Sequence, residues 1–137
     1  MRILIADADQ FFLESFQSYM WECGHDAEFA TNGIECSAIL YRFTPDVLII
    51  ERGLLWGGCD GILAKMQEQP DLALIPVIIL VVASQVVNEQ WDYPNIVAWM
   101  QKPFQLRDTL DQILSTVEPT HIVEQAKSGQ RMRSLSQ

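Results

Sequence analysis

Four charged residues stand close behind short apolar runs in this chain, and together they could bind a cation or a phosphoryl group. They are Asp7, Asp9, Glu51 and Lys102. Carboxylate oxygens are the ligands that Mg²⁺ prefers, and an ammonium group beside them can neutralise a carboxylate or an incoming phosphate. Charged residues behind strands are also common as plain solvated loop residues, so spacing alone leaves both interpretations open.

The positions of these residues depend on the elements that carry them. Short apolar runs, typical of buried strands, alternate with segments whose apolar residues recur at helical spacing. The strands are predicted at residues 2–6, 26–30, 47–50, 77–82 and 96–100. The helices are predicted at residues 10–23, 34–41, 62–69, 84–91 and 105–117, with Pro70 ending the third.

Strands that alternate with helices predict an α/β fold, in which a parallel five-stranded sheet is covered by helices on both faces. The ligand sites of such sheets lie at the carboxyl ends of the strands. We therefore expect Asp7, Glu51 and Lys102 to converge in one crevice, with Asp9 nearby.

Length and composition predict one domain. The chain has 137 residues, and a hydrophobic share of 49% is enough to form a core. We predict that residues 1–118 form this domain and that residues 119–137 are a tail, a linker or an added helix. The three cysteines, Cys23, Cys36 and Cys59, are odd in number and contain no C-x-x-C pair, which favours free thiols over disulfides or a zinc site.

Charge and hydropathy exclude several classes of function. The net charge is −9, and residues 1–119 carry 6 basic and 17 acidic side chains, so this part should repel nucleic acid. The longest apolar run, residues 77–83, is far shorter than the ~20 residues of a membrane span. The first residues lack the pattern of a signal peptide, so we expect a cytoplasmic protein with no membrane partner.

The chain resembles the receiver domains of bacterial two-component response regulators over residues 1–117. Four segments carry the resemblance, in the order and at the distances of that family. They are Arg2-Ile-Leu-Ile-Ala-Asp-Ala-Asp, Ala30-Thr-Asn-Gly-Ile-Glu-Cys-Ser-Ala, Pro45-Asp-Val-Leu-Ile-Ile-Glu and Lys102-Pro-Phe. The resemblance implies a flavodoxin-like sheet of strand order 2-1-3-4-5. It also implies a part in phosphorelay signal transduction, in which a histidine kinase passes a phosphoryl group to an aspartate with Mg²⁺.

The resemblance assigns a role to individual positions. It places the phosphoacceptor at Glu51 and the acidic pocket at Asp7, with Asp9 as a substitute for the second pocket acid, which falls on Ala8. The other family positions are the hydroxyl position at Val81 (Val82 with a slip of one residue), the lysine Lys102, the switch aromatic Trp99 and the cis-proline Pro103.

Three of these positions depart from the family and predict a pseudo-receiver that acts by protein–protein interaction. Glutamate is one methylene longer than aspartate, and phosphoryl transfer depends on positioning to within about an ångström, so Glu51 should be a poor acceptor. With Ala8 in place of an acid, Asp7 and Glu51 should bind Mg²⁺ only weakly, and no other cofactor is expected. Val81 offers no hydroxyl to a phosphoryl oxygen.

An alternative function is a working receiver that is phosphorylated at a non-standard acid, Asp7, Asp9 or Asp60. An independent enzyme is not expected, because the sequence has neither a nucleophile–base pair nor a glycine-rich phosphate loop. The expected partner is a histidine kinase, a phosphotransfer protein or an output protein. The resemblance also suggests a homodimer through the face built by residues 84–91, 96–100 and 105–117.

Three further side chains have open interpretations. Lys102 could pair with Glu51, and that pair would either imitate the phosphorylated state or only neutralise a leftover site. Trp56 stands in a loop about two residues longer than in the family, where it would cover the pocket, remain exposed or pack in the core. Trp99 would pack on its strand or anchor a partner.

Overall fold

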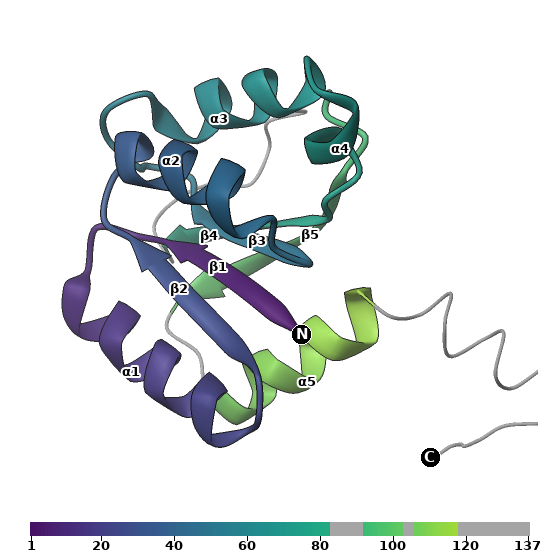
Figure 1. Ribbon diagram of the computed structural model, residues 1–137. Coiled ribbons are helices and arrows are strands. Elements are labelled where there is room, and N and C mark those ends of the chain that lie inside the picture. The colour runs from purple at the N-terminus through teal and green to yellow at the C-terminus, as the bar shows by residue number, and fades with distance from the viewer. Residues whose placement is uncertain (83–91, 103–105, 118–137) are drawn as a thin grey trace, which may run out of the picture.

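Five parallel strands form one sheet in the order β2-β1-β3-β4-β5 in the computed structural model, which describes residues 1–82, 92–102 and 106–117 (Figure 1). The strands are β1 (Arg2–Ala6), β2 (Asp26–Ala30), β3 (Val47–Glu51), β4 (Val77–Val82) and β5 (Ile96–Lys102). The predicted α/β class and the flavodoxin-like strand order are confirmed.

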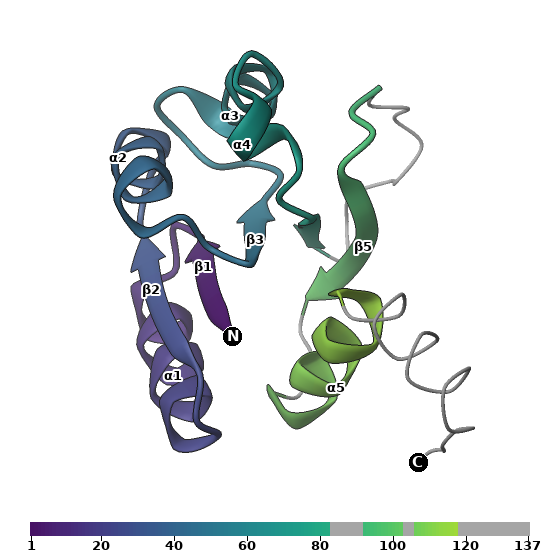
Figure 2. The same cartoon turned by 45° about the vertical axis from the view of Figure 1, so that its right-hand side comes forward.

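Helices cover both faces of this sheet. They are α1 (Gln10–Glu22), α2 (Gly33–Phe43), α3 (Gly58–Gln67), α4 (Pro70–Ala73) and α5 (Leu106–Val117). Helices α1 and α5 lie on one face, and α2 and α3 lie on the other (Figure 1 and Figure 2). Because β1, β3 and β4 are covered on both sides, nearly all their residues are buried, and their sequences are continuous apolar runs.

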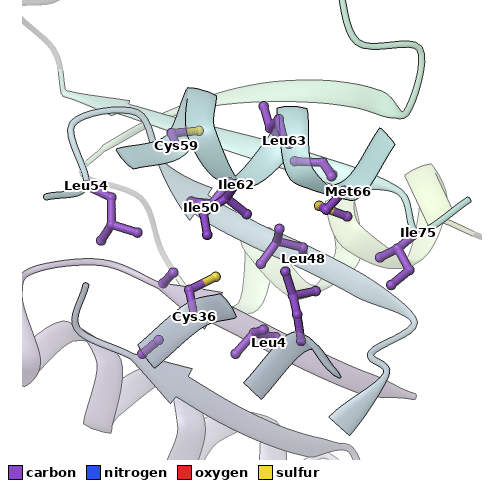
Figure 3. Packing of buried hydrophobic residues seen from close by; sticks show 14 of the residues in the cluster. Leu4, Cys36, Leu48, Ile50, Leu54, Cys59, Ile62, Leu63, Met66 and Ile75 are labelled. Atoms are coloured by element: carbon purple, nitrogen blue, oxygen red, sulfur yellow. The ribbon is translucent and has the colours of Figure 1, made fainter. Parts of the chain in front are cut away.

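Two hydrophobic clusters hold the helices to the sheet, one on each face. Leu48 and Ile50 of β3 pack in one cluster with Cys36 of α2 and Leu63 of α3 (Figure 3). The cluster on the opposite face contains Phe16 of α1, which is fully buried. Each buried side chain of this size contributes about 1.5–3 kcal/mol to folding relative to an exposed one.

Capping side chains fix where the first two helices begin. The Asp9 side chain accepts a hydrogen bond from the Phe12 N–H at 3.1 Å, and the Asn32 side chain accepts one from the Glu35 N–H at 2.9 Å. Glu35 in turn accepts a hydrogen bond at 2.7 Å from the N–H of Thr31, the residue before the cap. These caps start α1 and α2 at the carboxyl ends of β1 and β2.

The helices match the predicted ranges to within two residues except at two places. Helix α3 begins at Gly58, before its predicted start, and Pro70 begins the short helix α4 instead of simply ending α3. The predicted helix at 84–91 and the tail at 119–137 lie outside the described residues, so the domain boundary at 118 stays a prediction. Within the described ranges, no helix is long and apolar enough to cross a membrane.

Candidate functional site

The carboxyl ends of β1, β3 and β5 bring three of the predicted site residues together. Asp7 follows β1 and is only 1% exposed, while Glu51 ends β3 and Lys102 ends β5, both partly buried. Lys102 Nζ lies 2.6 Å from Asp7 Oδ2, and both charges act on the pKa of Glu51. The three side chains therefore form one charged group at this edge of the sheet, and their functional roles stay predictions.

Asp7 is the buried centre of this group, and both of its carboxylate oxygens have partners. Oδ1 accepts a hydrogen bond from the Asp9 N–H at 2.9 Å, and Oδ2 accepts one from Lys102. The Asp7 N–H donates to the Ala30 carbonyl at 3.0 Å, which continues the pairing of β1 with β2. These partners keep the buried carboxylate stable, because an uncompensated buried charge is strongly destabilising.

Lys102 reaches Asp7 from β5, and its side chain is 18% exposed. Its ammonium nitrogen also lies 5.0 Å from the centre of the Phe12 ring on α1, which is the geometry of a cation–π contact. The sequence suggested Glu51 as the partner of Lys102, but the ion pair is made with Asp7. This choice has a physical reason, since the buried Asp7 needs a counter-charge more than Glu51, which keeps contact with water.

Glu51 accepts a hydrogen bond from the backbone, and its surroundings both raise and lower its pKa. Its Oε1 accepts a hydrogen bond from the Ala8 N–H at 3.3 Å. The pKa of Glu51 is raised, first because burial disfavours the charged form and second because Asp7 repels it. The Ala8 hydrogen bond and the charge of Lys102 lower the pKa and are outweighed. Glu51 therefore keeps its proton to higher pH than an exposed glutamate would.

The other two acids considered from the sequence make structural hydrogen bonds. Asp9 is exposed, and its side chain caps α1 through the Phe12 N–H. Asp60 is exposed in the first turn of α3, and its Oδ1 accepts a hydrogen bond from Tyr93 Oη at 2.7 Å. Asp60 thus ties α3 to the segment that precedes β5.

The positions assigned by resemblance to the hydroxyl and the switch aromatic lie on β4 and β5. Val81 is buried and pairs with Gln101 of β5 in the sheet, and Val82 is partly buried. Neither valine can donate a hydrogen bond through its side chain. Trp99 is partly buried and packs against the cluster beneath α2 and α3. Pro103 lies outside the described residues.

The carboxylates do not form a donor set that suits Mg²⁺, which the resemblance would imply here. Mg²⁺ demands nearly octahedral oxygen coordination. Asp7 is already paired with Lys102, and Ala8 supplies no side-chain oxygen. In the part of the chain that the structure describes, no three His, Cys, Asp or Glu side chains are grouped so that they could hold a metal ion.

The loop that follows β3 makes contacts that the sequence did not predict. The Leu55 carbonyl accepts a hydrogen bond from the Gly33 N–H at 2.8 Å, which fastens the loop to the start of α2. Trp56 has a left-handed φ of 61° and is 67% exposed, so exposure is the observed one of its three interpretations. Positive φ at a non-glycine residue is rare, and glycine-rich sequence around Trp56 was the only signal for it.

Comparisons with known proteins place the fold. A scan against models of protein families finds no match, and no curated protein matches the sequence. A response regulator receiver domain protein from Clostridium thermocellum superposes with a TM-score of 0.74 at 18% identity, covering 89% of this chain and 98% of that chain.

Two further solved structures give the same result. The chemotaxis response regulator CheY4 of Vibrio cholerae has a TM-score of 0.71 at 19% identity, covering 82% of this chain and 98% of that one. The receiver domain of the Francisella response regulator 1452 has a TM-score of 0.69 at 21% identity, with 87% and 98% covered. At such low identity, the likeness shows that this chain has the fold of receiver domains, and the function must be argued from the site.

Proposed function

We propose that this chain is a receiver-type domain of two-component signal transduction that acts by binding partner proteins, with Glu51 in place of the phosphate-accepting aspartate. The single observation that carries the proposal is the state of Glu51 at the end of β3. Its Oε1 is bonded to the Ala8 N–H at 3.3 Å, and its pKa is raised by burial and by Asp7. An acceptor must be ionised and aligned with the phosphoryl group; the raised pKa works against the first condition, and the extra methylene of glutamate works against the second.

The rest of the charged group supports a neutralised site. Lys102 is engaged by Asp7 at 2.6 Å, so its charge compensates the buried carboxylate. The sequence left two roles open for a Glu51–Lys102 pair, and the contact of Lys102 with Asp7 favours neutralisation of the site over imitation of a phosphorylated state. A signalling module of this kind would meet a histidine kinase, a phosphotransfer protein or an output protein, and it would work in the cytoplasm.

The test is a phosphorylation assay on the full chain. The protein is incubated with acetyl phosphate and Mg²⁺, and its intact mass is followed over time. We expect no stable gain of one phosphoryl group as acetate leaves, because Asp7 is bonded to Lys102, Asp9 and Asp60 make structural hydrogen bonds, and Glu51 is one methylene too long. A stoichiometric gain would overturn the proposal. Mapping the modified residue would then decide between Glu51 and the alternative acceptors Asp7, Asp9 and Asp60.

A binding measurement separates the two roles of Glu51 once a partner is in hand. Glu51→Gln keeps the size of the side chain and removes its charge. If Glu51 imitates a phosphorylated state, this variant should bind the partner at least about tenfold more weakly, because binding would then depend on the negative charge of Glu51. An unchanged affinity would remove the imitation idea and leave the neutralised site.

A further inference from the structure

Helix α2 carries a second apolar stripe on the side that faces away from the sheet. Ile34, Ala38 and Tyr41 follow the spacing i, i+4, i+7, which places them on one face of the helix. Ile34 is 62% exposed and Tyr41 is 47% exposed. The buried stripe of α2, which includes Cys36 and Leu40, already packs against the sheet. The outward stripe has no part in that packing and needs another explanation.

The loop after β3 extends this apolar surface. Leu55 and Trp56 are 63% and 67% exposed. A hollow of about 540 Å³ lies between α2 and α3, and Ile34, Ala38 and Trp56 contribute to its lining. The Gly33 N–H bonds the Leu55 carbonyl at 2.8 Å, so the loop is held firmly beside α2. We call Ile34, Ala38, Tyr41, Leu55 and Trp56 the α2 surface.

Exposed apolar groups gathered in this way mark an interaction site, and the charge of the chain narrows the choice of partner. A net charge of −9 disfavours nucleic acid and anionic membranes. Trp and Tyr, both present in the α2 surface, are enriched among the residues that dominate protein–protein binding. A protein is therefore the occupant to consider.

Two opposite charges flank the stripe on the same edge of α2. Glu35 lies in the first turn and bonds Thr31, which follows β2, while Arg42 lies in the last turn and pairs with Glu28 of β2 at 2.8 Å. Both side chains therefore lie on the edge of α2 that faces β2. They are separated by about 10 Å along the helix at ~1.5 Å per residue.

The positions of Glu35 and Arg42 make this edge of α2 complementary to the same edge of a second copy whose α2 helix runs antiparallel. We propose that two copies of this chain associate through the α2 surface, with their α2 helices antiparallel across a two-fold axis near Ala38. The axis keeps the charged edges of both helices on the same side, so Glu35 of each copy meets the partner's Arg42. Ala38, the smallest residue of the stripe, lies at the crossing, where it lets the helices approach to about 8 Å.

The apolar residues are arranged to suit the same geometry. An antiparallel pair of helices brings the start of one against the end of the other, so Ile34 meets the partner's Tyr41. Trp56 and Leu55 lie beside the start of α2 and widen the contact at both ends of the interface. An interface of this kind is isologous, because each copy contributes the same residues.

The overall charge opposes this association and sets the conditions of its measurement. Two bodies of −9 repel each other, and this repulsion is screened over about 8 Å at 0.15 M salt. We therefore expect a reversible dimer that forms at physiological ionic strength and high protein concentration. The α2 surface lies on the face of the sheet opposite to α5, so it differs from the dimer face suggested by family resemblance (Figure 2).

The test is a charge swap followed by sedimentation velocity at 0.15 M salt over about 10 µM to 1 mM protein. Glu35→Lys or Arg42→Glu alone should weaken dimerisation about tenfold or more, because each places like charges opposite each other. The double variant should return to within about threefold of the original Kd. It still carries the local costs of losing the Thr31 and Glu28 contacts, so only pairing between two copies explains its recovery.

A second pair of variants tests the apolar part of the surface. Trp56→Asn removes the indole and keeps a residue that tolerates positive φ, and it should weaken the dimer about tenfold or more. Phe11→Ser on α1 is the matched control, since Phe11 is 82% exposed away from the α2 surface, and it should change the Kd less than about twofold.

Each of these outcomes either supports or overturns the proposed dimer. A chain that stays monomeric to about 1 mM would overturn the proposal and leave the α2 surface to a different protein. A dimer that ignores Trp56→Asn, or that is not rescued by the double charge swap, would overturn it equally. The proposal does not depend on the role of Glu51, so its failure would leave the proposed function untouched.

Discussion

Lys102 Nζ lies 2.6 Å from Asp7 Oδ2, and this bond ties the last strand of the sheet to the first across 95 positions of the chain. Strands β1 and β5 are not neighbours, because β3 and β4 lie between them. The ion pair therefore crosses over the end of β3, where Glu51 stands. It sets the electrostatic surroundings of Glu51 and also holds the edge of the sheet together.

Breaking this ion pair from one side should be costly. Lys102→Met leaves the buried Asp7 without its counter-charge, and we expect a loss of about 3 kcal/mol in the free energy of unfolding. The double variant Asp7→Asn/Lys102→Met removes both charges and should recover most of this loss. Urea denaturation of the single and double variants at pH 7 measures both values. Equal losses in the single and double variants would show that Lys102 acts through packing and not through Asp7.

Neutralising Glu51 should stabilise the protein in a pH-dependent way. The folded state raises the pKa of Glu51 above its ordinary value of 4.5, so folding favours the protonated form. The stabilising contribution of Glu51 is present below pH 4.5 and is lost as pH rises through the raised pKa. Glu51→Gln stays neutral and escapes this loss, so it should be more stable at pH 7 by up to about 1 kcal/mol, a modest gain because Glu51 is only partly buried and water screens its charge.

Chemical denaturation at pH 4 and pH 7 checks the Glu51 prediction. The advantage of Glu51→Gln over the original chain should shrink toward zero at the lower pH. The control is Glu22→Gln at an exposed position on α1, where we expect little change at either pH. An advantage of the same size at both pH values would contradict the proposed cause.

Gly33 is required by the close approach of the loop after β3. A Cβ at this position would lie 2.1 Å from the Trp56 carbonyl oxygen, so Gly33→Ala must displace backbone. We expect a loss of about 1–3 kcal/mol in the free energy of unfolding, as for other overpacked sites. Gly61→Ala is the matched control in α3, where an added Cβ meets nothing within 4 Å, and it should gain about 0.5–1 kcal/mol. Thermal or urea unfolding of both variants would show the opposite signs.

The fold could be predicted because its elements carry strong local signals. The central strands β1, β3 and β4 are short and apolar on both faces, so their predicted positions match the structure to within one residue. The start of α3 was missed because Gly57 and Gly58 adopt positive φ in a glycine-rich loop, which conceals where the helix begins. Helix α4 was missed because Pro70 was taken only as a stop, although proline also suits the first helical turn.

The candidate site could be predicted only in part. The topology of the sheet gave the convergence of Asp7, Glu51 and Lys102, because parallel strands end at the same edge. The choice of Asp7 over Glu51 as the partner of Lys102 depends on burial of each carboxylate, which a sequence pattern does not report. The same limit explains why the exposure of Trp56 stayed open, since a tryptophan in a loop carries no signal of the direction it faces.

The three thiols should react at very different rates. Cys23 is exposed, whereas Cys36 and Cys59 are buried, and burial raises the pKa of each to about 12. Thiolate is the reactive form, and with a pKa of about 12 only ~10⁻⁴ of each buried thiol is ionised at pH 8. We expect a disulfide reagent such as DTNB to modify one thiol of the folded protein quickly. In about 6 M guanidinium, which unfolds most proteins completely, it should modify all three quickly.

The thiol prediction has a simple control. Cys23→Ser should abolish the fast phase and leave the slow reaction unchanged. Rapid modification of two or three thiols in the folded chain would mean that the cluster between α2 and α3 opens readily, against the packing of Cys36 and Cys59 in that cluster.

If Ala8 and Glu51 are the reason why this chain does not accept a phosphoryl group, returning both positions to the family's aspartate should restore phosphorylation. Ala8→Asp/Glu51→Asp supplies a second pocket acid and shortens the acceptor by one methylene, which moves its oxygens back toward the crevice. With acetyl phosphate and Mg²⁺, we expect this variant to gain one phosphoryl group about 10²-fold faster than the original chain, the size of a positioning effect of about an ångström. Ala8→Asp alone is the matched control and should remain slow, because Glu51 keeps its length. If the original chain and the double variant reacted at the same rate, the length of the acceptor side chain and the missing pocket acid could not be what makes this site inactive.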